Sequence, residues 1–144
     1  KGGELRKNPT HLIDIMTTCM DIGGLEYPAN YNGNTIHPME GTSLVPAMEG
    51  KDLNREAIYW EHEGNRAVRM GKWKLISKAN KKNSYIWDKT AELGLKNWEL
   101  FDMEKDRTET HDLAATHPDL VNKMAQMWLE WGKRTGIVPR PSIK

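Results

Sequence analysis

The chain has 144 residues, a formal net charge of +1 and a hydrophobic content of 38%. This length suits one ordinary domain, and the sequence contains no run of eighteen apolar residues that would predict a membrane span. Basic and acidic residues are interspersed, which excludes the clustered Lys and Arg of a nucleic-acid interface. Cys19 is the only cysteine, so no internal disulfide is expected. The polar start "KGGELRKNPT" has neither an initiator Met nor a signal sequence, and it indicates a piece of a longer chain.

The first predicted element is a helix over residues 10–22. Apolar residues recur here at the three-and-four spacing of a stripe that faces a core. Pro9 or Thr10 suits the first turn, and Gly23 with Gly24 suits the end. Because Cys19 lies on this stripe, it is predicted to be a buried structural thiol and not a nucleophile. The stripe consists of Leu12, Ile15, Met16, Cys19 and Met20.

A loop and a short helix are predicted next. Residues 25–41 are dense in Pro, Asn and Gly, which favour turns. The segment "TSLVPAMEG" then offers Thr42 or Ser43 as an N-cap, with Pro46 early enough to lie in the first turn of a short helix.

Three strands are predicted between residues 57 and 78, joined by two tight turns. With Gly64 and Asn65 as a type II′ turn, strand 57–63 pairs with strand 66–70 and Glu63 faces Arg66. A second turn at Gly71 and Lys72 adds strand 73–78.

The period-two alternation of side chains assigns the two faces of this meander. The second face is half apolar and half basic, so it either meets a partner or carries ordinary amphipathic side chains at an edge. The core face contains Tyr59, Val68, Met70, Trp73 and Leu75, and the second face contains Ile58, Trp60, His62, Ala67, Arg69, Lys74 and Ile76.

The rest of the chain completes an α+β fold. Residues 78–97 read as an exposed connection, and "WELFDM" reads as a fourth strand. Thr116 and Asp119 resemble a capping box that starts a helix, and Gly136 suits its end. We therefore expect a small antiparallel sheet of about four strands packed against a C-terminal helix, with an extended tail after it. The apolar stripe of that helix is Leu120, Met124, Met127, Trp128 and Trp131.

No complete catalytic or metal-binding motif is found. The acids of "DMEKD" alternate like the start of a calcium loop, but Arg107 and Leu113 stand where Gly and Glu are needed. The five histidines lack the paired spacing and Cys companions of a zinc site. Phosphate-binding glycine loops and a Gly-x-Ser-x-Gly motif are also missing from the sequence. The sequence therefore assigns neither catalytic residues nor metal ligands.

Five segments, in this order, resemble the C-terminal part of a type I sulfatase of the alkaline-phosphatase superfamily, the arylsulfatase-A-like group. They are "THLIDIMTTCMDIGGLEYP", "GTSLVPAMEGK", "REAIYWEHEGNRAVRMGKWKLIS", "WELFDMEKDRTETHDLA" and "HPDLVNKMAQMWLEWGKRTGI".

The resemblance implies a two-part parent enzyme that hydrolyses sulfate esters of a sugar or an aryl compound. Residues 1–50 would be the tail of the N-terminal catalytic α/β domain, and residues 51–144 the C-terminal subdomain. Calcium and a formylglycine nucleophile are implied for the parent, which is expected to be periplasmic or secreted. The family's nucleophile motif is Cys or Ser, x, Pro or Ala, x, Arg, whereas "MDIG" follows Cys19. The fragment alone is therefore expected to be inactive and to need the rest of the catalytic domain as its partner.

The resemblance also implies that the first turn of the meander lies toward the active-site opening. His62, Asn65 and Arg66 would then contact the part of a sulfated small molecule or glycan beyond the sulfate. In the alternative interpretation, Arg66 only pairs with Glu63 at the surface and His62 is solvated.

A second hypothesis for the whole chain is a free-standing carbohydrate-binding or interaction module. Trp60 and Trp73 in the hairpins would then hold the sugar.

Overall fold

A computed structural model describes residues 2–78 and 97–137, so residues 79–96 of the predicted connection 78–97 and the tail from 138 lie outside the described residues. The chain divides into two compact units, Lys1–Arg55 and Glu56–Lys144. The second unit contains a four-stranded antiparallel sheet and a long helix, and the first contains a helix of nine residues. The fold is α+β, as the sequence predicts.

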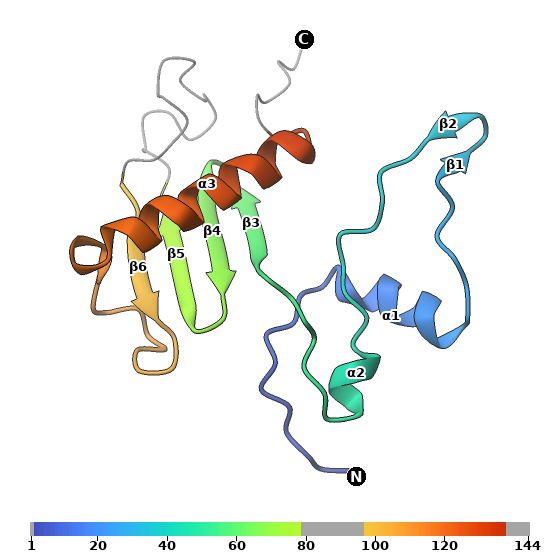
Figure 1. Cartoon of the computed structure of the whole chain (residues 1–144), viewed down its shortest axis with the longest axis horizontal. Coiled ribbons are helices and arrows are strands. Elements are labelled where there is room, and N and C mark those ends of the chain that lie inside the picture. The colour runs from blue at the N-terminus through green and yellow to red at the C-terminus, as the bar shows by residue number, and fades with distance from the viewer. Residues whose placement is uncertain (1, 79–96, 138–144) are drawn as a thin grey trace. The chain divides into compact units, whose positions relative to one another are not determined.

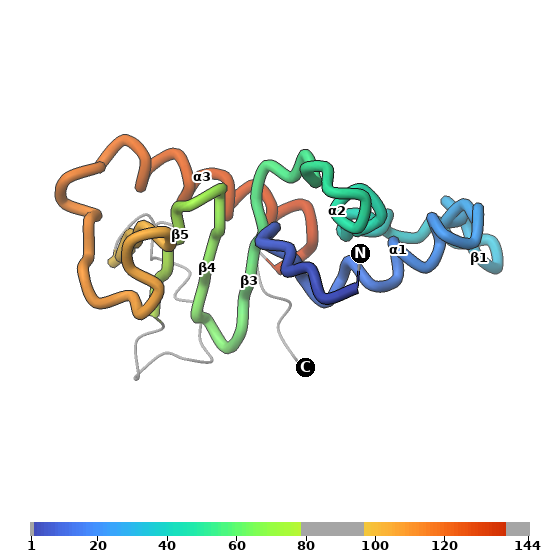
Figure 2. Tube along the Cα trace, turned by 90° about the horizontal axis from the view of Figure 1, so that it is seen from below, coloured from blue at the N-terminus to red at the C-terminus, as the bar shows by residue number. Residues whose placement is uncertain are grey.

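The sheet of the second unit has the strand order β3-β4-β5-β6 (Figure 1). Its strands lie side by side in chain order, and a view turned by 90° shows β3, β4 and β5 again as neighbours (Figure 2). The strands are β3 (Ile58–His62), β4 (Asn65–Met70), β5 (Trp73–Ser77) and β6 (Glu99–Asp102).

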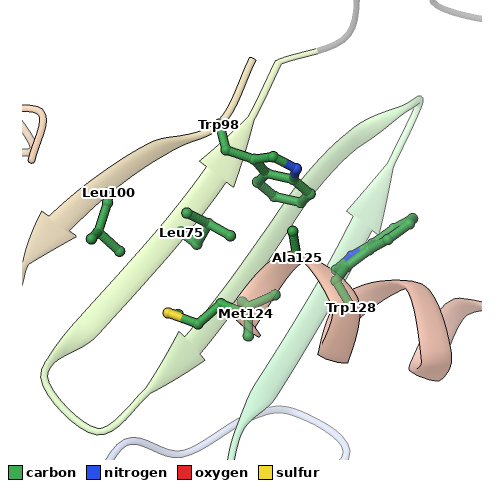
Figure 3. Packing of buried hydrophobic residues seen from close by; sticks show 7 residues of the cluster. Leu75, Trp98, Leu100, Met124, Ala125 and Trp128 are labelled. Carbon is green, nitrogen blue, oxygen red and sulfur yellow. The ribbon is translucent and has the colours of Figure 1, made fainter. Parts of the chain in front are cut away.

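The helix α3 (Pro118–Arg134) covers one face of this sheet (Figure 1). Val68, Leu75 and Leu100 occupy the same row across three strands and face Met124 and Trp128 of the helix. These apolar side chains are removed from water together, which is the main stabilising contribution to the unit. Figure 3 shows this core and labels all of its buried residues except Val68; they are Val68, Leu75, Trp98, Leu100, Met124, Ala125 and Trp128.

The faces of the meander agree with the predicted alternation, but the position of the first turn was predicted wrongly. His62 pairs with Asn65, so the two turn residues are Glu63 and Gly64, and Arg66 lies opposite Glu61. Relative to the predicted pairing of Glu63 with Arg66, each strand is displaced by one residue, so the register differs by two residues. Because side chains alternate with a period of two, every side chain stays on its predicted face. The second turn, at Gly71 and Lys72, is confirmed by the pairing of Met70 with Trp73.

The helix α3 begins one residue later than a Thr116 cap would place it. His117 is the N-cap and Pro118 is the first helical residue, while the Thr116 hydroxyl donates a hydrogen bond of 2.9 Å to the Leu113 carbonyl oxygen. That bond belongs to the short 3-10 helix η1 (Ala114–Thr116), so the predicted capping box is not formed. The predicted end is confirmed, because Gly136 has a positive φ of 75° just after the helix.

In the first unit, α1 (Asp14–Ile22) begins later than the predicted helix over 10–22. Residues 11–14 form a turn, in which the Asp14 amide donates to the His11 carbonyl oxygen over 3.0 Å. The predicted end of the helix at Gly23 is confirmed.

The face of α1 that is buried within its unit was predicted wrongly. Asp14 and Thr18 are buried, whereas the apolar stripe, including Cys19, is exposed except for the half-buried Met20. The reason is that Asp14 and Thr18 accept hydrogen bonds from the segment 42–55, which covers the polar side of the helix. Cys19 is therefore not a buried thiol in this structure.

Two short elements complete the first unit. The loop 25–41 contains a small hairpin of β1 (Asn30–Tyr31) and β2 (Asn34–Thr35), which the sequence analysis missed. The predicted short helix is present as α2 (Val45–Met48), with Leu44 as its N-cap in place of Thr42 or Ser43.

Candidate functional site

The candidate site is the turn between β3 and β4. Glu63 and Gly64 have φ values of 52° and 84°, so both central residues are left-handed, as in a type I′ turn. The Gly64 amide donates to Oε1 of Glu61 over 2.8 Å, and Nδ2 of Asn65 donates to the His62 carbonyl oxygen over 2.9 Å. Side chains on both sides of the turn therefore hold its backbone.

The structure brings two of the three predicted substrate-binding side chains together. His62 and Asn65 are directly opposite each other across the hairpin, and both are exposed. Alternation along the strands places them on the face of the sheet opposite α3, because Val68 and Tyr59 face the helix. The adjacent exposed imidazole and carboxamide can both donate and accept hydrogen bonds, which suits the hydroxyl groups of a sugar.

Arg66 lies next to this pair in the chain, but its side chain is on the helix-covered face. Its guanidinium carbon lies 4.7 Å from the ring centroid of Trp98 and 5.5 Å from that of Trp128. Nη2 of Arg66 donates to the Ser77 hydroxyl over 2.7 Å. Burial lowers the pKa of Arg66 below its usual value, yet an arginine stays charged at neutral pH. Its charge is therefore held by aromatic faces inside the unit.

Trp60 and Trp73 do not form one surface for a sugar. Trp60 pairs with Ala67 on the face opposite α3, whereas Trp73 pairs with Met70 on the helix-covered face. The ring of Trp73 lies 5.0 Å from that of His117. A single carbohydrate ring cannot stack on both indoles, and the binding-module hypothesis itself stays a prediction.

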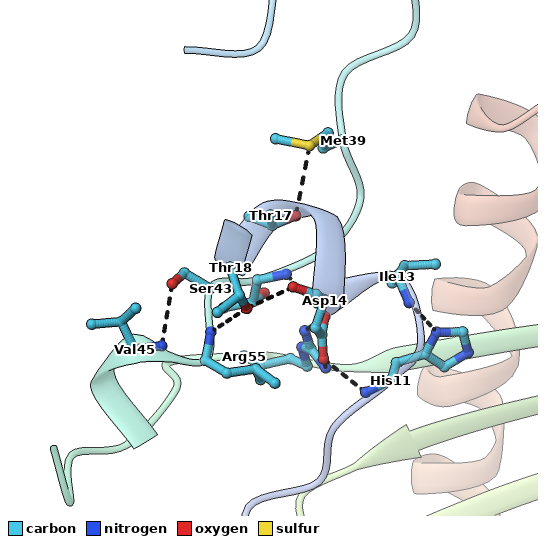
Figure 4. Close-up of polar contacts among 11 residues, drawn as sticks. His11, Ile13, Asp14, Thr17, Thr18, Met39, Ser43, Val45 and Arg55 are labelled. Carbon is cyan, nitrogen blue, oxygen red and sulfur yellow. Dashed lines mark hydrogen bonds and ion pairs between the residues drawn. The ribbon is translucent and has the colours of Figure 1, made fainter. Parts of the chain in front are cut away.

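A second polar cluster, around Asp14, was not found from the sequence (Figure 4). Its buried carboxylate accepts hydrogen bonds from the backbone amides of His11 and Thr42, over 2.7 and 3.0 Å, and from Nη1 of Arg55 over 2.9 Å. Nη2 of Arg55 binds the second carboxylate oxygen, which makes the ion pair bidentate. Arg55 is 41 residues away in the chain, and no local pattern links the two positions.

The ionisation of Asp14 follows from these contacts. Burial acts to raise its pKa, but the hydrogen bonds from Arg55, Thr42 and His11 outweigh burial, and the pKa lies below its usual value. A charged Asp14 therefore joins the start of α1 to residues 42 and 55 of the same unit. At Gly41, just before Thr42, an added Cβ would lie 2.2 Å from the Ile13 carbonyl oxygen, so the backbone approaches the helix too closely for a side chain.

Asp102 and Asp106, at and after the end of β6, bind amides of the loop that follows, and Asp102 also binds Lys72 of the β4–β5 turn. The hydrogen bond from Lys72 lowers the pKa of Asp102, and the backbone amide of His111 lowers the pKa of Asp106. Within residues 2–78 and 97–137, the structure contains no group of three or more His, Cys, Asp or Glu side chains that could hold a metal ion. In the same two ranges, none of the helices has the length and apolar character needed to cross a membrane.

Comparison with known proteins adds the family context. The chain is 28% identical over 135 residues to an uncharacterized sulfatase of Schizosaccharomyces pombe, a match that covers 90% of this chain and 22% of that protein. It is 25% identical over 166 residues to the ulvan-active sulfatase of Formosa agariphila, covering 96% of this chain and 32% of that protein. Over nearly its whole length, the chain is similar to sulfatases. No family model matches it.

Solved structures show the same fold. The crystal structure of Ps i-CgsB matches with a TM-score of 0.65 and 23% identity, over 90% of this chain and 25% of that chain. BT4656, solved in complex with its substrate D-glucosamine-2-N,6-O-disulfate, matches with a TM-score of 0.59 and 21% identity, over 91% of this chain and 25% of that chain. The present chain thus spans between a fifth and a third of the length of these sulfatase relatives and structural neighbours.

Proposed function

We propose that this chain is the C-terminal part of a larger, formylglycine-dependent sulfatase that hydrolyses sulfate esters. The observation that carries the proposal is that nearly the whole chain is similar to sulfatases three to four times its length. Among its relatives, the Formosa agariphila protein is named for activity on ulvan. A sulfated carbohydrate is accordingly the preferred substrate class, with an aryl sulfate as the second.

The chemistry of the proposed reaction assigns most of the catalytic machinery to the rest of the parent. Sulfate-ester hydrolysis needs an activated nucleophile, a cation that balances the sulfate charge and an acid for the leaving alcohol. Cys19 is not followed by the residues of the nucleophile motif. Three acids of the described segments already have partners within this chain: Asp14 binds Arg55, Asp102 binds Lys72, and Asp106 binds the His111 amide. Formylglycine and calcium are therefore expected in the remaining chain, and this part alone is expected to be inactive.

The exposed stripe of α1 is the surface that would contact the rest of the parent. Leu12, Ile15 and Met16 are 78%, 55% and 57% exposed, and Cys19 is exposed beside them. A contiguous apolar face of this kind marks an interaction site in a protein of otherwise ordinary composition. In the full-length parent, Met16→Asp should reduce the melting temperature and soluble yield, whereas Met48→Asp on the short α2 should not. Equal effects of the two substitutions would argue against this contact.

We assign the turn of the β3–β4 hairpin to the rim of the parent's substrate pocket, with His62 and Asn65 as the contacting side chains and Arg66 at the base of the turn. Support comes from the exposed pair of His62 and Asn65 and from the hydrogen bonds that hold the turn in one conformation. The rim would contact sugar groups beyond the sulfate that is cleaved.

The rim is tested in the full-length enzyme. His62→Ala should lower kcat/KM on the natural sulfated substrate by about tenfold, near 1.4 kcal/mol, through a higher KM. Turnover of a small aryl sulfate should be nearly unchanged, because this substrate has no sugar groups that could reach the rim. The melting temperature should also be nearly unchanged. Identical kinetics of variant and wild type on both substrates would leave this turn as a structural hairpin only.

A further inference from the structure

Arg66 is held at the base of the β3–β4 turn by three other elements of its unit. Its guanidinium lies against Trp98, just before β6, and Trp128 of α3, and it donates to Ser77 of β5. Ser77 is 2% exposed, so this hydrogen bond is sheltered from solvent. Arg66 is the first residue after the turn whose side chain reaches the core face, and it therefore anchors β4 where the turn ends.

The strand opposite Arg66 is anchored at the same level. Glu61 pairs with Arg66 across the hairpin, and its Oε1 accepts the Gly64 amide of the turn. One residue earlier, the carbonyl oxygen of Trp60 accepts a hydrogen bond of 2.9 Å from Nε1 of Trp128. Trp128 thus contacts both strands, through the Arg66 guanidinium on β4 and the Trp60 carbonyl on β3.

We propose that Arg66 is a positioning residue that sets the orientation of His62 and Asn65, and that it does not itself bind the substrate. This inference rests on the proposed function of the turn as a substrate rim. The planar guanidinium fits between two indoles and a hydroxyl, a set of contacts that a lysine ammonium cannot reproduce. When these contacts are lost, the turn keeps its hydrogen bonds but loses its fixed attachment to the helix and β5.

The test is a double-mutant cycle in the full-length sulfatase, assayed with the extended sulfated glycan and with a small aryl sulfate. Arg66→Met keeps an unbranched side chain on the indoles and removes the planar charge. It should lower kcat/KM on the glycan by about tenfold through KM, like His62→Ala, and leave aryl sulfate turnover unchanged. The double variant should be no worse than either single variant, because Arg66 acts through His62 and Asn65.

Two matched variants and one physical readout complete the test. Ser77→Ala removes only the hydrogen bond and should change KM in the same direction by a smaller factor. Arg69→Met is the control, because this arginine of the same strand donates to the carbonyl oxygen of Gly71 at the other end of the hairpin. In the 144-residue chain without substrate, Arg66→Met should shift the backbone amide resonances of residues 62–65, and Arg69→Met should not.

The outcomes separate this inference from the proposed function. If His62→Ala leaves glycan kinetics unchanged, both the rim and the positioning role are wrong. If His62→Ala raises KM, three results would show that Arg66 contacts the substrate and that only the positioning role is wrong. The effects of His62→Ala and Arg66→Met could multiply in the double variant, Arg66→Lys could keep the wild-type KM that Arg66→Met loses, or the effect of Arg66→Met on glycan binding could depend strongly on salt.

Discussion

Trp128 shows how one side chain connects several parts of the second unit. It is 1% exposed, it packs edge-on against the rings of Trp98 and Trp131, and its indole donates to the Trp60 carbonyl oxygen. The helical spacing of the sequence predicts that Trp128 is buried. The cation that it meets could not be predicted, because the wrong turn position left Arg66 opposite Glu63 at the surface.

Replacement of Trp128 tests this packing. Trp128→Ala should lower the free energy of unfolding by roughly 3–5 kcal/mol, since it removes a large buried ring and leaves a cavity. Urea denaturation of the 144-residue chain measures this loss. Lys123→Ala, at an exposed position of the same helix, should change stability by no more than about 0.5 kcal/mol. Equal midpoints for the two variants would contradict the burial of Trp128.

The buried ion pair of the first unit makes a pH-dependent prediction. The pKa of Asp14 is below its usual value of 3.8 in the folded chain. Its stabilising contribution is therefore fully present above about pH 4, and it is lost as the pH falls through the folded pKa below that value. The Thr42 amide, which donates to Asp14, should be protected from hydrogen exchange at pH 6 in the wild type and much less in Asp14→Asn. This difference should shrink as the pH falls below the folded pKa of Asp14, while protection of the Val68 amide serves as the control. A difference that persists unchanged into strong acid would show that Asp14 is not charged in the fold.

At the scale of elements, the hydrophobic pattern predicted which side of a strand or helix is apolar more reliably than it predicted which part of the protein covers that side. Period-two alternation assigned both faces of β3, β4 and β5, because a strand side chain can point only to one side or the other. The stripe of α1 was also identified, but an amphipathic pattern says that a face is apolar and does not say which part of a protein covers it. Asp14 and Thr18 are buried through hydrogen bonds to residues far away in the chain, for which no periodicity exists.

The β3–β4 turn gives an element-level prediction. Glu63 is left-handed, a conformation that costs a residue with a Cβ about 1 kcal/mol or more unless it is Asn, Asp or Gly. The β1–β2 hairpin uses the preferred pair, Asn32 and Gly33, at the corresponding positions.

Glu63→Asn should accordingly raise the free energy of unfolding by about 0.5–1 kcal/mol, measured by thermal denaturation. Glu56→Asn, at an exposed position before β3, removes the same charge and should leave stability nearly unchanged. A loss of stability in Glu63→Asn would mean that the glutamate side chain itself supports the turn.

At the scale of the whole molecule, the division at Arg55 and Glu56 separates a unit with a hydrophobic core from one held mainly by polar contacts. The sequence-based boundary at 50 and 51 rested on the resemblance, and the assignment of residues 1–50 to a catalytic domain stays a prediction. Each unit carries one proposed contact, the α1 stripe toward the rest of the parent and the β3–β4 turn toward the substrate.

Limited proteolysis of the 144-residue chain tests the relative stability of the two units. The first cuts should fall in residues 25–41, which are largely exposed and carry only two-residue strands. Residues 57–78 should resist longer, because their backbone is hydrogen-bonded within the sheet and one face is buried. Early cleavage between β3 and β5 would contradict this order.

The central claim, that the chain is an inactive part of a larger sulfatase, is tested most directly by one assay on two proteins. The 144-residue chain and the product of the complete reading frame that encodes it are each incubated with an aryl sulfate and calcium. We expect no turnover from the chain, because the barrier to sulfate-ester cleavage stays high without an activated nucleophile, and turnover from the complete product. Sulfate release by the purified chain alone, or a complete product that lacks the nucleophile motif and releases no sulfate, would contradict the claim.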